Sequence, residues 1–107
     1  MADPYGGERE ALIATVTRGP GSLAPEIRAA LVDRAKGRTG FRNFSPLLAE
    51  FADAVTQDAP VITDADVTTL LDHGFDEEAI FEAAVAAALG ASLVRLERVD
   101  MLLRLER

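Results

Sequence analysis

The chain has 107 residues, a length that suits one domain with a single hydrophobic core. It contains no cysteine, so disulfides, thiolate metal sites and cysteine redox chemistry are excluded. With 49% hydrophobic residues, few aromatic ones and a formal net charge of −7, the composition favours a folded helical protein and argues against a nucleic-acid-binding one.

The N-terminal part of the chain predicts two helices separated by a turn. Residues 1–7 contain a proline and two glycines and are predicted as a flexible lead-in. Apolar residues at helical spacing predict a helix over 8–18, and the Gly-Pro-Gly sequence at 19–21 ends it. A second helix is predicted from Ser22 or Ala24 to Gly37, with its proline near the first position.

Two further helices are predicted in the middle of the chain. Residues 38–44 are predicted as a loop that docks two phenylalanines, and a third helix runs from Ser45-Pro46 to about Gln57. After a loop over 58–62, Thr63 and Asp66 have the spacing of a capping box and begin a short fourth helix. Gly74, in the left-handed conformation, is predicted to end it.

The stretch from Ala79 to Val94 is apolar on almost every side. Asp76 is predicted to cap it, and nothing in the sequence ends the helix before the chain terminus. Such a helix must be covered on nearly all sides, in a core or at a subunit interface. Its small residues should allow neighbouring backbones to approach closely; they are Ala83, Ala87, Gly90 and Ala91. Beyond Arg95 the helix is predicted to be amphipathic, with three apolar residues on one face: Leu96, Val99 and Leu103.

These elements predict one all-α domain over 1–107, a bundle of about five helices with the Ala-rich helix at its centre. A short chain has too few helices to cover that helix completely, so we expect a homo-oligomer. The apolar stretch is short for a membrane span and carries Glu82, so no membrane partner is expected. No signal-peptide pattern is present, and a cytoplasmic protein is the default expectation.

Charge is distributed unevenly along the chain. Residues 1–44 carry seven basic and five acidic side chains, whereas residues 45–94 carry ten acidic and no basic ones. We expect the basic residues between Arg28 and Arg42 to lie against the acidic segment from Glu50 to Glu82, within one chain or between subunits.

From Ser45 to about Leu103 the chain resembles the alkylhydroperoxidase D-like, or carboxymuconolactone decarboxylase-like, family. The matching stretches are Val61-Ile62-Thr63-Asp64-Ala65-Asp66 and Gly74-Phe75-Asp76-Glu77-Glu78-Ala79-Ile80, followed by the Ala-rich helix. The resemblance implies an all-α fold of that kind. The family's redox activity uses a Cys-x-x-Cys motif, which this chain lacks, so no catalytic residue is carried over.

The sequence is compatible with three functions. The first is a non-redox, self-associating helical module without cofactor or metal. The second is an enzyme of the decarboxylase or lactonase type, with carboxylates in a pocket between subunits. The third is an accessory protein of a peroxidase system.

Two residues are weak catalytic candidates. His73 is the only histidine and could carry a proton, although the end of a helix is also a favourable place for it. Glu82 lies on the apolar helix, where a buried carboxylate could act as a general acid or base or could pair with an arginine. Neither residue completes a catalytic constellation.

Overall fold

The computed structural model describes residues 6–37, 45–57 and 62–105, which form five α-helices and no β-strand. The helices are α1 (Gly6–Arg18), α2 (Pro25–Ala35), α3 (Pro46–Gln57), α4 (Asp64–Asp72) and α5 (Glu77–Leu105). The predicted all-α bundle around an Ala-rich helix is confirmed, whereas the alkylhydroperoxidase D-like architecture stays a prediction. α1 begins two residues earlier than predicted, and residues 1–5 and the loop at 38–44 lie outside the described ranges.

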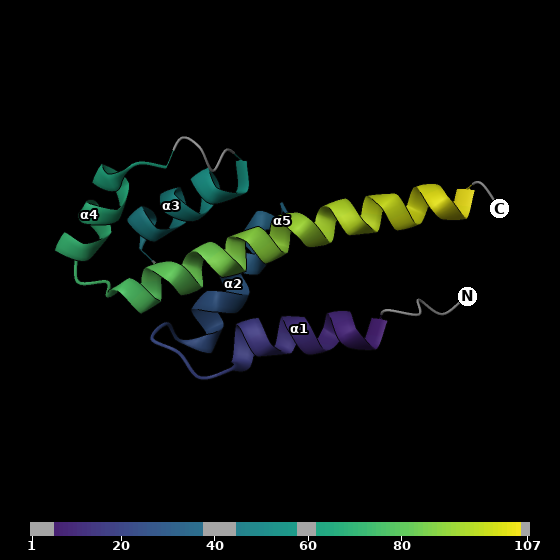
Figure 1. The fold of residues 1–107 in the computed structure, drawn as a ribbon, viewed down its shortest axis with the longest axis horizontal. Coiled ribbons are helices and arrows are strands. Elements are labelled where there is room, and N and C mark those ends of the chain that lie inside the picture. Colours follow the sequence, from purple (N-terminus) through teal and green to yellow (C-terminus); the bar gives the residue numbers. More distant parts are fainter. Residues whose placement is uncertain (1–5, 38–44, 58–61, 106–107) are drawn as a thin grey trace.

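Helix α5 is the axis of the molecule, and Figure 1 shows the other helices gathered around its N-terminal half. It contacts all four of them, most extensively α2 and α3. The core forms where these contacts meet. Its most deeply buried residues are Ala30, Leu31, Leu48, Ala52, Leu70, Ala83, Ala86 and Ala87. The small side chains predicted to allow close approach therefore lie in the core of one chain, and not at an interface between chains.

The closest approach of two helices occurs where α2 crosses α5. A Cβ atom added to Gly90 would collide with the Val32 carbonyl oxygen and the Ala35 methyl group. Glycine is therefore required at this point of α5 because the backbone of α2 occupies the space of a side chain.

The helix ends follow the predicted signals. At the end of α4, Gly74 has φ +93°, and the N–H groups of Gly74 and Phe75 donate to the carbonyls of Leu71 and Leu70. This is a Schellman motif. At the start of α5, the Asp76 carboxylate accepts a hydrogen bond of 2.7 Å from the Ala79 N–H.

Two ion pairs join the basic N-terminal half to the acidic segment. Arg34 donates from two nitrogens to the two oxygens of Asp53, at 2.7 and 2.8 Å. This hydrogen bonding raises the pKa of Arg34 above its ordinary value. The second pair is Arg28 with Glu82, at 4.0 Å. Of the other basic residues in the predicted cluster, Arg38 and Arg42 lie outside the described ranges.

Replacing Gly90 by alanine tests the close approach of α2 and α5. Alanine is the better helix former, yet its methyl group would force the two helices apart. We expect a loss of about 1–3 kcal/mol in the free energy of unfolding, measured by urea denaturation. Gly7→Ala in α1 is the control, because nothing lies within 4 Å of the new methyl group. A Gly90→Ala variant as stable as Gly7→Ala would contradict this packing.

Candidate functional site

The Glu82 carboxylate binds the turn between α1 and α2. Its two oxygens accept hydrogen bonds from the backbone N–H groups of Ser22 and Leu23, at 2.8 and 2.9 Å. Gly21 lies against the same carboxylate, and a Cβ atom there would come within 2.7 Å of it. Each oxygen of Glu82 is thus already engaged by the backbone of a distant part of the chain.

Arg28 completes this arrangement from α2. The residue is only 3% exposed, and its Nε lies 4.0 Å from Glu82. It donates at 3.1 Å to the carbonyls of Leu23 and Val16, the latter in α1. A buried guanidinium is tolerated when its N–H groups have acceptors and a carboxylate lies nearby. Arg28 and Glu82 together therefore hold the turn between α1 and α2 against α5.

A cavity of about 140 Å³ borders Glu82 between α1 and α5. Its other lining residues are mainly apolar: Thr15, Val16, Pro20, Arg28, Phe81 and Val85. Phe81 is the notable member, because 68% of its surface is exposed. The cavity is a shallow hollow with a mixed polar and apolar lining beside an aromatic ring, and its carboxylate is turned to the backbone of the turn.

The structure places His73 far from any such arrangement. His73 is the C-cap residue of α4 and is exposed. Its Nδ1 lies 2.8 Å from the Thr69 carbonyl oxygen. A histidine beside a carbonyl group in the last turn of a helix interacts favourably with the helix dipole. The structure thus does not bring His73 and Glu82 together.

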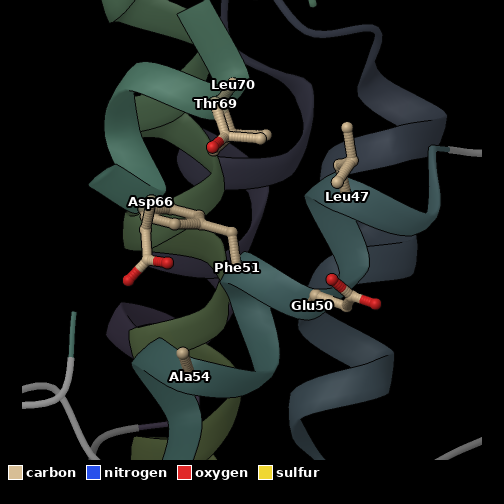
Figure 2. A pocket seen from close by; sticks show the side chains of 7 residues that line it. All are labelled: Leu47, Glu50, Phe51, Ala54, Asp66, Thr69 and Leu70. Atoms are coloured by element: carbon tan, nitrogen blue, oxygen red, sulfur yellow. The ribbon is translucent and has the colours of Figure 1, made fainter. Parts of the chain in front are cut away.

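A larger cavity of about 260 Å³ lies between α3 and α4. Figure 2 shows its lining side chains, with the carboxylates of Glu50 and Asp66 on either side of Phe51. Asp66 accepts the Thr63 N–H at 2.9 Å and so belongs to the cap of α4. Across the described parts of the chain, no group of three potential ligands is placed to hold a metal ion.

The most unusual surface is the C-terminal part of α5, which projects beyond the bundle in Figure 1. Its large apolar side chains are between 40% and 76% exposed. We call this set the tail surface: Val94, Leu96, Val99, Met101, Leu102, Leu103 and Leu105. The amphipathic pattern predicted beyond Arg95 identified only three of them. The other four could have been identified from a different signal. As in the buried half of α5, apolar residues lie on several sides of the helix in its C-terminal part.

Length and composition alone would allow α5 to cross a membrane. However, 44% of the residues in its most apolar stretch are buried inside the bundle, as in the core helix of a globular domain. The length and composition of α5 therefore do not distinguish a membrane-spanning helix from the core helix of a globular domain.

No protein-family model, curated protein or solved structure matches this chain.

Replacing Glu82 tests whether its carboxylate has the structural role that the hydrogen bonds indicate. Glu82→Ala removes the acceptor of two N–H groups and the counter-charge of Arg28, so we expect a loss of about 2–3 kcal/mol in the free energy of unfolding. Glu82→Gln, which keeps one acceptor oxygen, should lose less.

Glu78→Ala is the matched control for this experiment, because Glu78 is an exposed acid one turn earlier in the same helix. Urea denaturation of the three variants gives the comparison. Equal stabilities of Glu82→Ala and Glu78→Ala would show that the Glu82 carboxylate does not stabilise the turn between α1 and α2.

Proposed function

We propose that the protein is a non-redox, self-associating helical module, of the alkylhydroperoxidase D-like kind but without that family's cysteines. The observation that carries the proposal is the tail surface of α5. Large apolar side chains that are exposed together on one part of a folded domain mark a site of association.

The energetics favour a covered tail. Burying one large aliphatic side chain is worth about 1.5–3 kcal/mol relative to leaving it in water. The seven side chains of the tail surface are between 40% and 76% exposed and lie on several sides of α5, and the described helices cover mainly the part of α5 before them. Burial of one side of the tail surface by another helix would offset part of the cost of association, which is estimated at about 4–15 kcal/mol.

The surroundings of Glu82 support a module over an enzyme. A general acid or base needs a carboxylate presented to a substrate, within hydrogen-bond reach of the proton it moves. Both oxygens of Glu82 instead accept backbone N–H groups of the α1–α2 turn.

A decarboxylase or lactonase activity remains the alternative, and the small cavity beside Glu82 is the observation that favours it. If the cavity binds a substrate, Glu82→Gln should abolish turnover while self-association persists. The accessory role is a third proposal, in which the tail surface binds another protein in place of a second copy.

The self-association test uses charge on the tail surface. At tens of micromolar, light scattering should show the wild type as a dimer or larger, and the double variant Leu96→Glu/Val99→Glu as a monomer with unchanged helical circular dichroism. Both side chains are about half exposed in the single chain, so their replacement should leave the fold intact.

Leu12→Glu in α1 is the matched control, because Leu12 is 52% exposed but lies outside the tail surface. It should assemble like the wild type. A wild type that stays monomeric at about 100 µM would refute the module.

A further inference from the structure

One face of α5 carries a continuous strip of residues with a regular spacing. The strip runs along the helix at intervals of four, three and four residues, repeated twice. Its members, which we call the α5 strip, are Phe81, Val85, Ala88, Ser92, Leu96, Val99 and Leu103. All are exposed except Val85, which is half-buried.

The spacing keeps the strip on one side of a straight helix. Phe81 precedes Ser92 by eleven residues, and Leu103 follows it by eleven. An eleven-residue repeat has about 3.67 residues per turn, close to the 3.6 of an undistorted α-helix. A second straight helix can therefore contact the strip along its whole length.

The strip is symmetric about Ser92. Reading outward from Ser92 in either direction gives the same spacing, so Ala88 corresponds to Leu96, Val85 to Val99 and Phe81 to Leu103. In an antiparallel pair with a two-fold axis at Ser92, each residue meets its counterpart. Ala88 meets the partner's Leu96, and the serines meet at the centre. Small residues face large ones or each other there, which allows two helices to pack closely.

The cavity beside Glu82 adds an independent observation. It lies at the N-terminal end of the strip and is lined by Phe81 and Val85 from α5 and by residues of α1. In the antiparallel pair this hollow faces the partner's Val99 and Leu103, two side chains of the tail surface. This hollow, whose lining also includes Glu82 and Arg28, thus presents its apolar side chains Phe81 and Val85 to exposed apolar side chains from the other end of the strip.

Charge at the ends of α5 favours the same direction. The first turn of α5 carries Glu77 and Glu78, and the last turn carries Arg104. Antiparallel pairing places the partner's Arg104, which also pairs with Asp100 of its own helix at 3.0 Å, within one turn of each acidic first turn, and it sets the two helix dipoles in opposition. Parallel pairing would place the two acidic turns side by side.

From these observations we propose that the α5 strip packs against the α5 strip of a second copy of the chain. The two helices run antiparallel about a two-fold axis at Ser92. This inference rests on the proposed self-association and specifies its geometry. The cavity beside Glu82 is then closed by the partner's tail.

Single cysteines test the geometry, because the chain has none of its own. Ser92→Cys lies on the two-fold axis and should form a disulfide-linked dimer under mild oxidation. Leu103→Cys alone should not, since eleven residues on each side of the axis separate the two thiols by about 33 Å along the pair. Phe81→Cys alone should behave like Leu103→Cys, whereas an equimolar mixture of the two should give a cross-linked heterodimer.

The outcomes separate this inference from the proposed function. If the wild type self-associates but Leu103→Cys cross-links as readily as Ser92→Cys, the helices pair parallel and the antiparallel geometry is wrong. If the wild type self-associates and no strip cysteine cross-links, the strip is not the interface.

A charge experiment gives a second readout. Glu77→Arg/Glu78→Arg should weaken dimerisation by about tenfold at low salt, because each exposed pair is worth about 0.2–1 kcal/mol and occurs twice in the dimer. The difference from the wild type should shrink in 1 M sodium chloride. Unchanged affinity at low salt would contradict the antiparallel arrangement. A wild type that is monomeric but binds phosphatidylglycerol vesicles would overturn both proposals and assign the tail surface to a membrane.

Discussion

The need to cover α5 determines the arrangement of the other helices. A helix without a polar face is stable in water only when neighbours cover it, and here four helices of the same chain pack against its first half, leaving the side of Phe81, Ala88 and Ser92 exposed. The absence of a side chain at Gly90 lets α2 come close to α5 on the covered side. After Leu93 the described helices no longer cover α5, and its apolar side chains are exposed to solvent. The packing of the other helices on α5 and the exposed tail surface therefore have the same origin, which is that α5 is apolar on nearly every side.

A second constraint is that the backbone groups of the turn between α1 and α2 need hydrogen-bond partners. The charged side chains of Glu82 and Arg28 meet it. A short Gly-Pro-Gly turn has backbone groups with no helical partner, and each buried group without an acceptor would cost stability. Glu82 accepts two of these N–H groups, while Arg28 donates to carbonyls on both sides of the turn. In the described parts of the chain, no buried polar side-chain atom lacks a hydrogen-bond partner. The buried Arg28 thus serves the connection of two helices.

Local signals were sufficient to predict the helices from the sequence, and they fixed most of the boundaries closely. Asp76 and Gly74 act through backbone groups a few residues away, so their effect can be read without knowledge of the fold. The role of Glu82 could not be read in this way, because its partners lie about sixty residues earlier and depend on how α5 packs. For the same reason the sequence could not show that Ala87 faces α5's own bundle while Leu96 faces solvent. Both positions are apolar, and only the extent of the other helices separates them.

The position of α5 after the four helices that contact it has a consequence for synthesis. The helix around which the others pack leaves the ribosome after them, so α1, α2 and α3 emerge without the surface that buries Leu31 and Leu48. At about 5–20 residues per second, the interval between the end of α2 and residue 82 lasts about 2–10 seconds. During that time the nascent chain carries apolar helical faces with nothing to enclose them. The domain can complete its folding only after the first half of α5 has emerged, and its yield in a cell then depends on what shields those faces during translation.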